Sequence, residues 1–145
     1  MYRHILIPTD GSALSDQAIR QGVSLARTFG AGVTALTVSP TFHNFSLDPA
    51  LLTATPERYE QDCQARAEKH LAAARVEAGI AGVPCETVHE MNDEPYQVII
   101  DTARARHCDL IAMPTHGRRG ISALLLGSET SKVLTHSKIP VLVCR

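Results

Sequence analysis

The chain of 145 residues has no tryptophan, three tyrosines and three phenylalanines, and its formal net charge is −1. This near-neutral balance excludes a broad electrostatic attraction to nucleic acid or to an anionic membrane surface. No apolar run approaches the roughly 20 residues that a membrane-spanning helix needs. The first residues, Met1–Pro8, lack the long apolar region and the cleavage site of a signal peptide, so we expect a cytoplasmic protein.

Patterns for disulfides and metal sites are missing as well. Cys63, Cys85, Cys108 and Cys144 are scattered and form no C-x-x-C pair, which favours four small hydrophobic side chains in a reducing compartment. The seven histidines are also dispersed, and no two of them have the spacing of four residues that places zinc ligands on one helix face.

Two common nucleotide loops and the usual nucleophile settings are absent too. No Gly-Lys-Ser/Thr sequence closes the glycine-bearing loop of the last third, which excludes a Walker A motif. The first turn, residues 9–12, is too short for a dinucleotide fingerprint. Ser12 and Ser128 lack a G-x-S-x-G elbow and an evident His/Asp pair, so the sequence does not predict an efficient hydrolase.

What is present is a regular alternation of strand and helix patterns. Hydrophobic periodicity and turn residues predict strands over residues 3–8, 32–38, 84–91, 109–113 and 139–144. Helices are expected between them, with Ser12 as the first N-cap and Gly30 as its stop, Thr55-Pro56-Glu57 starting the second and Gly79 ending it, Asn92 or Asp93 capping the third, and residues 128–136 forming the last. Residues 39–54 have no clear period.

This order of elements predicts one α/β domain over residues 1–145. Right-handed crossovers would give a three-layer, doubly wound parallel sheet with helices on both faces. Ligands of such sheets bind beyond the carboxyl ends of the strands, where the strand order switches. If the first and fourth strands are neighbours, the turn Pro8–Ser12 and the loop Pro114–Ser128 face one crevice.

The second of these loops has the chemistry of an anion site. Gly117 and Gly120 permit positive φ and a close backbone approach, and Gly127-Ser128 offers N–H groups at a helix start. Arg118 and Arg119 could add bidentate contacts to a phosphate. The residues alone allow an equal alternative, a solvated loop with glycines for turns and arginines for solubility.

Asp10 directly follows the first strand. A carboxylate there could accept hydrogen bonds from a ribose or a base, or help to hold Mg²⁺ beside phosphates. The alternative is that Asp10 caps its own turn or the first helix.

The segments Ile5–Ser12 and Cys108–Met113, together with the dense stretch from Thr115 to Cys144, resemble the universal stress protein family over nearly the whole chain. The resemblance implies the sheet order 3-2-1-4-5 and an adenine nucleotide alpha hydrolase-like fold. ATP-binding members carry G-x-x-G, nine residues, then G-S or G-T. Gly117 and Gly127-Ser128 fit this pattern, but Pro114 stands at the first glycine. Proline has no N–H to donate, so the site is weaker here if the N–H of that glycine binds phosphate. If the glycine only lets the chain turn, a proline suffices.

The resemblance implies ATP, with Mg²⁺ as a possible companion, as the cofactor. Pro8, Thr9, Asp10 and Val38 would surround the adenosine, and Gly117, Arg118, Gly127, Ser128 and Glu129 would line the phosphates. Met113, His116 and Gly120 complete the predicted binding site, and Asp10 is the candidate for contact with Mg²⁺. The Glu129 carboxylate opposes phosphate by its charge, so its side chain is expected to point away.

The last strand, Ile139–Cys144, is expected at a sheet edge and predicts a homodimer that pairs two such edges. The leading functional interpretation is a stress-response protein that binds an adenine nucleotide as a sensor or regulator. The alternative is a dimeric interaction module with a vestigial pocket, and slow ATP hydrolysis or autophosphorylation comes third. A phospho-receiver domain fits less well, because the third strand ends in Glu90-Met91-Asn92-Asp93, and ATP-pyrophosphatases would need a glycine-rich first loop.

Overall fold

The computed structural model describes residues 1–45, 55–117 and 126–145. In these residues the strands are β1 (His4–Pro8), β2 (Gly32–Ser39), β3 (Cys85–Met91), β4 (Leu110–Pro114) and β5 (Val141–Cys144). The helices are α1 (Ala13–Phe29), α2 (Phe42–Phe45), α3 (Pro56–Ala81), α4 (Pro95–Ala105) and α5 (Ser128–His136). The short helix α2 lies in the segment for which the sequence showed no period.

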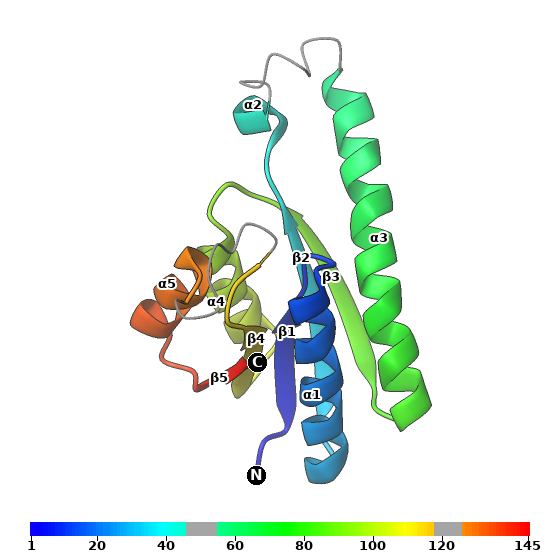
Figure 1. Cartoon of the computed structure of the whole chain (residues 1–145), viewed down its shortest axis with the longest axis vertical. Helices are drawn as coiled ribbons and strands as arrows, with labels where there is room; N and C mark the ends of the chain where they lie inside the picture. Colours follow the sequence, from blue (N-terminus) through cyan, green and yellow to red (C-terminus); the bar gives the residue numbers. More distant parts are fainter. Residues whose placement is uncertain (46–54, 118–125) are drawn as a thin grey trace.

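The five strands form one parallel sheet in the order β3-β2-β1-β4-β5. This confirms the predicted architecture and strand order. Figure 1 shows α1 and α3 together on one side of the sheet and α4 with α5 on the other. Ile5 pairs with Leu110 and Leu6 with Ile111, so β1 and β4 are neighbours and the two candidate loops leave the same edge of the sheet.

The three central strands of the sheet, β2, β1 and β4, are largely buried on both faces, as is usual for parallel pairing. Ile5, Leu6 and Ile7 of β1 are all 0% exposed. Because alternate side chains of a strand point to opposite faces, Ile5 and Ile7 belong to one core and Leu6 to another. The core under α1 and α3 contains Ile5, Ile7, Val23, Val33, Leu71 and Ala112, among others. The core under α4 and α5 contains Leu6, Leu36, Ile99, Ile111, Met113 and Val133, among others.

Most of the predicted helix boundaries are confirmed. The Ser12 side chain accepts from Ser15 N–H, Thr55 accepts from Arg58 N–H, and Gly30 ends α1 with φ 66°. The prediction that Gly79 ends α3 is wrong. The helix continues to Ala81, and Gly82 supplies the left-handed C-cap with φ 71°. A helix of this kind ends at the glycine that adopts positive φ, and Gly79 does not adopt it.

The predicted cap of α4 is also wrong. The N-cap position is Glu94, which makes no side-chain capping bond. Asn92 accepts from Glu94 N–H at 2.8 Å, outside the helix. The Asp93 carboxylate instead accepts from the N–H and the hydroxyl of Thr41, at 2.9 and 2.7 Å. Asp93 therefore holds the segment that follows β2, and the first turn of α4 is capped from elsewhere in the fold.

Asp109, predicted to open the fourth strand, lies just before it and anchors the start of β1. Its carboxylate accepts from the N–H groups of Arg3 and His4, at 2.9–3.1 Å. Its own N–H donates to His4 O at 2.9 Å. These contacts extend the pairing of β1 with β4 beyond the ladder itself.

The cysteines behave as the sequence indicated. All four are free thiols, and Cys63, Cys108 and Cys144 are buried. Burial raises the pKa of the Cys108 thiol to about 12, and it also raises the pKa of Cys85 and Cys144. Within the described ranges, no helix is both long enough and apolar enough to cross a membrane.

The packing of α1 on β1 generates a stability prediction. A Cβ at Gly22 would lie 2.5 Å from Ile7 Cδ1, so we expect Gly22→Val to lower the free energy of unfolding by about 1–3 kcal/mol through overpacking. Urea unfolding measures the change. The matched control is Gly79→Val, because a Cβ at this exposed helix position meets nothing within 4 Å. Equal effects of the two variants would contradict the close approach of α1 to β1.

Candidate functional site

The first half of the candidate site is the turn that follows β1. Asp10 Oδ1 accepts from Ser12 N–H at 2.9 Å and from the Ser15 hydroxyl at 3.0 Å. Thr9 continues the ladder, since its N–H donates to Leu36 O at 2.8 Å. Asp10 therefore caps its own turn, which was the alternative to a ligand contact. Its second oxygen, Oδ2, faces the other loop.

The second half of the candidate site is the start of the loop after β4, which contacts the Asp10 turn. A Cβ built on Gly117 would lie 2.4 Å from Asp10 Oδ2. This distance is far below van der Waals contact, so a side chain at position 117 would require the Asp10 carboxylate to move. The two loops that the sequence placed at one crevice are therefore in contact, one through its carboxylate and the other through its backbone.

The loop after β4 is closed at its base. Gly127 N–H donates to Thr115 O at 2.7 Å, and the Thr130 hydroxyl donates to Pro114 O at 2.9 Å. A Cβ at Gly127 would lie 2.9 Å from His116 Cα, so glycine is needed here for close approach as well. These contacts hold the first turn of α5 beside the end of β4.

This closure changes the expected role of Gly127. Its N–H is used within the loop, and the N–H groups that follow it belong to Ser128 and Glu129, which as first-turn residues have no acceptor within the helix. They point from the positive end of the helix dipole, where an anion is stabilised. The donors for a phosphate would therefore be those of Ser128 and Glu129.

Gly117 was expected to permit positive φ, but it does not adopt it. Gly127 has φ −61°, and the described glycines with positive φ are Gly11, Gly30 and Gly82. Gly117 is required by its contact with Asp10 instead. Arg118, Arg119 and Gly120 lie outside the described residues.

The other predicted site residues differ in whether their side chains lie near the two loops. Pro8 ends β1 opposite Leu36, and Val38 lies further along β2 in the same direction. His116 is half-buried, and its Nδ1 lies 3.1 Å from the Thr115 hydroxyl. Met113 is 4% exposed and packs in the core under α4 and α5, so its side chain does not face the loops.

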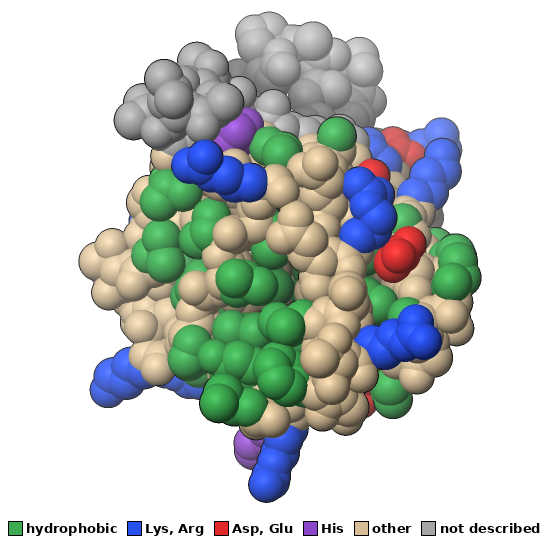
Figure 2. Space-filling model, turned by 60° about the horizontal axis from the view of Figure 1, so that its bottom comes forward, with side chains coloured by type: hydrophobic (Ala, Val, Ile, Leu, Met, Phe, Trp, Pro, Cys, Tyr) green, Lys and Arg blue, Asp and Glu red, His purple; other side chains and the backbone are tan. Residues whose placement is uncertain are grey.

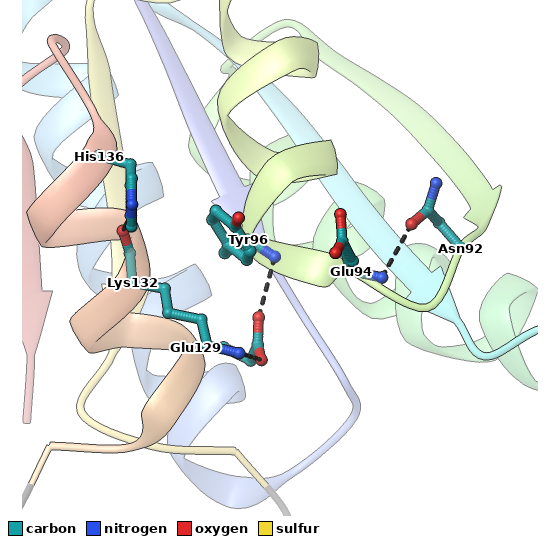
Figure 3. A network of polar contacts seen from close by, with 6 residues as sticks. All are labelled: Asn92, Glu94, Tyr96, Glu129, Lys132 and His136. Carbon is teal, nitrogen blue, oxygen red and sulfur yellow. Dashed lines mark hydrogen bonds and ion pairs between the residues drawn. The ribbon is translucent and has the colours of Figure 1, made fainter. Parts of the chain in front are cut away.

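The Glu129 side chain points away from the loops, as expected. Its Oε2 accepts from Tyr96 N–H at 2.9 Å, and its Oε1 lies 3.3 Å from Lys132 Nζ. Figure 3 shows this carboxylate between α5 and the start of α4. The charge that seemed to oppose phosphate is therefore directed at the neighbouring helix.

Sequence reasoning missed the contact of α3 with the site. Gly11 has φ +76°, and a Cβ there would lie 2.4 Å from two atoms of the His70 ring. His70 lies in the middle of the long helix α3, so this helix packs against the Asp10 turn at Gly11. Nothing in the local sequence around His70 indicates this role, because the contact depends on how α3 crosses the sheet.

The described residues bring no three His, Cys, Asp or Glu side chains together as a metal-binding group. The Asp10 carboxylate lies against Gly117, at the start of the loop after β4. It could contribute one ligand to an ion that is held mainly by other groups.

The Gly11 contact gives a second prediction. Gly11→Ala and Gly30→Ala both place a side chain at positive φ, which costs about 1 kcal/mol, but a Cβ at Gly30 meets nothing within 4 Å. We expect Gly11→Ala to lower the free energy of unfolding by about 1–2 kcal/mol more than Gly30→Ala. His70→Ala in the Gly11→Ala background should recover part of this difference in chemical denaturation, and additive losses would show that the His70 ring does not limit the space at Gly11.

Comparison with known proteins identifies the family. Residues 1–145 match the Universal stress protein family. The chain is 30% identical over 150 residues to a universal stress protein of Methanocaldococcus jannaschii, covering 100% of this chain and 83% of the relative. It is also 30% identical over 145 residues to a universal stress protein of Thermus aquaticus, covering 100% of both.

Solved structures agree with this result. UspA of Lactobacillus plantarum has a TM-score of 0.78 at 28% identity, over 99% of this chain and 98% of that one. A universal stress protein in complex with cAMP has a TM-score of 0.73 at 24% identity, over 99% and 97%. The universal stress protein of Archaeoglobus fulgidus in complex with dAMP has a TM-score of 0.72 at 19% identity, over 99% and 98%. The last two likenesses show the fold alone, and with the whole-chain family match they lead to one conclusion: this chain belongs to the universal stress protein family.

Proposed function

We propose that this protein binds an adenine nucleotide, with ATP as the expected ligand, and acts as a sensor or regulator in a stress response. The observation that carries the proposal is the contact between Gly117 and the Asp10 carboxylate. It joins the turn after β1 to the loop after β4 at the edge of the sheet where ligands of doubly wound folds bind.

The geometry divides such a site into two ends. Asp10, Thr9, Pro8 and Val38 lie at the carboxyl ends of β1 and β2, where a carboxylate and backbone groups suit a ribose and a base. The first-turn N–H groups of α5 lie at the other end, where the helix dipole favours phosphate. Gly117 lies against Asp10, and Arg118 is expected to add charge to the phosphate end.

The family supports this assignment, because two solved universal stress proteins with the same fold are complexes with cAMP and dAMP. Both ligands are adenine nucleotides with one phosphate. ATP is the finer proposal for this chain, and it rests on the glycine spacing from Gly117 to Gly127-Ser128.

Mg²⁺ fits the site as a companion of the nucleotide. It keeps several waters and binds through one or two carboxylates together with phosphate oxygens. Asp10 supplies one carboxylate, so the nucleotide would have to supply most of the remaining ligands. When bound, Mg²⁺ would neutralise charge on the phosphates.

Binding with little turnover fits the chemistry of this carboxylate. Asp10 Oδ1 already accepts hydrogen bonds from Ser12 and Ser15, so this oxygen is engaged in its own turn and is poorly placed to take a proton from an attacking water. A cytoplasmic location stays a prediction of the sequence.

We also propose that the protein forms a homodimer through β5. Among the described strands, β5 pairs with β4 alone and lies at the edge of the sheet. Leu142 is 38% exposed and borders an open hollow of about 440 Å³ between β5 and α1. Hydrophobic side chains also gather on the face of the molecule that is turned toward the reader in Figure 2. A second copy placed along β5 would satisfy its backbone groups and cover such surface.

Isothermal titration with ATP, with and without Mg²⁺, tests the nucleotide site. We expect Gly117→Ala to weaken binding at least about tenfold, which corresponds to about 1.4 kcal/mol, because its Cβ displaces Asp10 from the loop. Gly79→Ala is the matched control, since its Cβ is unobstructed, and it should bind like the natural protein. Thermal unfolding of both variants checks that they fold.

Titrations with AMP and cAMP identify the number of phosphates that the site prefers. Failure of the natural protein to bind any of the three nucleotides at millimolar concentration would contradict the proposed function. That result would favour a dimeric interaction module with a vestigial pocket.

Sedimentation equilibrium tests the dimer. We expect Leu142→Asp to shift the protein to monomer, because two carboxylates would face each other at the paired edge. Ile80→Asp should leave the dimer intact, since Ile80 is 81% exposed on α3, which lies over β2 and β3 rather than β5. A natural protein that is monomeric at about 100 μM would contradict the proposal, because stable homodimers form far below that concentration.

A further inference from the structure

The start of α4 has an unusual cap. Helix starts normally satisfy their free N–H groups with a side chain from the N-cap residue. Glu94 occupies that position without making such a bond, and Asp93 is bonded to Thr41. The N–H of Tyr96, in the first turn, instead donates to Glu129 Oε2 of α5 at 2.9 Å (Figure 3).

The same carboxylate lies at the start of its own helix. Glu129 is the second residue of α5, so its charge lies beside the N-termini of two helices. The positive ends of both dipoles favour a carboxylate there. Its remaining oxygen, Oε1, lies 3.3 Å from Lys132 Nζ, and this exposed ion pair contributes little by itself. The hydrogen bond to Tyr96 N–H is therefore the specific contact.

Aromatic contacts reinforce the same junction. The Tyr96 ring lies 5.3 Å from the His136 ring, between centroids, at an interplanar angle of 40°. Lys132 Nζ lies 5.5 Å from the centroid of the Tyr96 ring. Tyr96 thus meets the first turn of α5 through its backbone and the last turn through its ring, which fixes the direction of α5 relative to α4.

The first turn of α5 is also bonded to the end of β4. Gly127 N–H donates to Thr115 O, and the Thr130 hydroxyl donates to Pro114 O. The turn that contains Ser128 is therefore held between the end of β4 on one side and the start of α4 on the other. Loss of either anchor would loosen the position of this turn and of its N–H groups.

We propose that Glu129 is a positioning residue of the nucleotide site, acting through its bond to Tyr96 N–H. This inference rests on the proposed function. By binding α4, the carboxylate holds the first turn of α5 so that its N–H groups face the phosphate position. Its own charge lies at the start of α4, where it accepts from Tyr96 N–H. By linkage, a bound nucleotide strengthens the cap of α4, so the site and the start of that helix are energetically coupled.

Three variants test this role. Glu129→Ala removes the acceptor, Glu129→Gln keeps an oxygen that can accept from Tyr96 N–H, and Lys132→Met removes the ion pair while leaving the cap. The readouts are the amide hydrogen-exchange rates of Tyr96 and Ser131 in the ligand-free protein and ATP affinity by titration. Ser131 N–H donates to Gly127 O at 3.0 Å and therefore reports the first turn of α5.

We expect Glu129→Ala to speed exchange at both amides and to weaken ATP binding about three- to tenfold, which is the size of the coupling between the cap of α4 and the site. Glu129→Gln should restore both readouts, and Lys132→Met should leave both as in the natural protein. ATP should slow the exchange of Tyr96 N–H in the natural protein and not in Glu129→Ala.

Two results would overturn the inference and leave the proposed function standing. One is Ser131 exchange that does not change in Glu129→Ala. The other is ATP binding in Glu129→Ala that is as tight as in the natural protein or tighter, which would mean that the carboxylate merely repels phosphate. A natural protein that binds no adenine nucleotide contradicts the proposed function itself and removes the site that Glu129 would position.

Discussion

The parallel pairing of β1 with β4 is the constraint on which the candidate site depends. The ladder from Ile5–Leu110 to Leu6–Ile111 is short, and Asp109 reinforces it by binding the N–H groups at the start of β1. Because the sheet order switches at this pair, no crossover helix fills the space beyond the strand ends. The Asp10 turn and the Gly117 loop, far apart in the sequence, meet in that space.

Close approach of other atoms, rather than unusual backbone conformation, explains the described glycines Gly117 and Gly127 of the loop after β4. Gly117 leaves room for the Asp10 carboxylate, and Gly127 leaves room for the backbone of His116. Both contacts are tertiary, so they select glycine by excluding a Cβ. Gly11 combines the two reasons, since it has positive φ and also lies against His70.

Carboxylates that bind the backbone of another element recur in this fold. Asp109 binds the start of β1, Asp93 binds Thr41 after β2, and Glu129 binds the start of α4. Each satisfies N–H groups that local residues leave free, and each ties two elements together at an end of the sheet or of a helix. An ionised acceptor makes a stronger bond than a neutral one, which suits this long-range use.

The sequence by itself determined the α/β class, the alternation of elements and most helix ends, because periodicity, Ser12, Gly30 and Thr55-Pro56 act within a few residues of chain. Its motif spacing, read by resemblance, gave the family and the strand order. Tertiary structure decided the rest: that Gly82 rather than Gly79 ends α3, that Glu129 rather than Asp93 caps α4, and that Gly117 lies against Asp10. The physical reason is that a side chain chooses among acceptors by distance in space, and only the packed sheet brings those acceptors within reach.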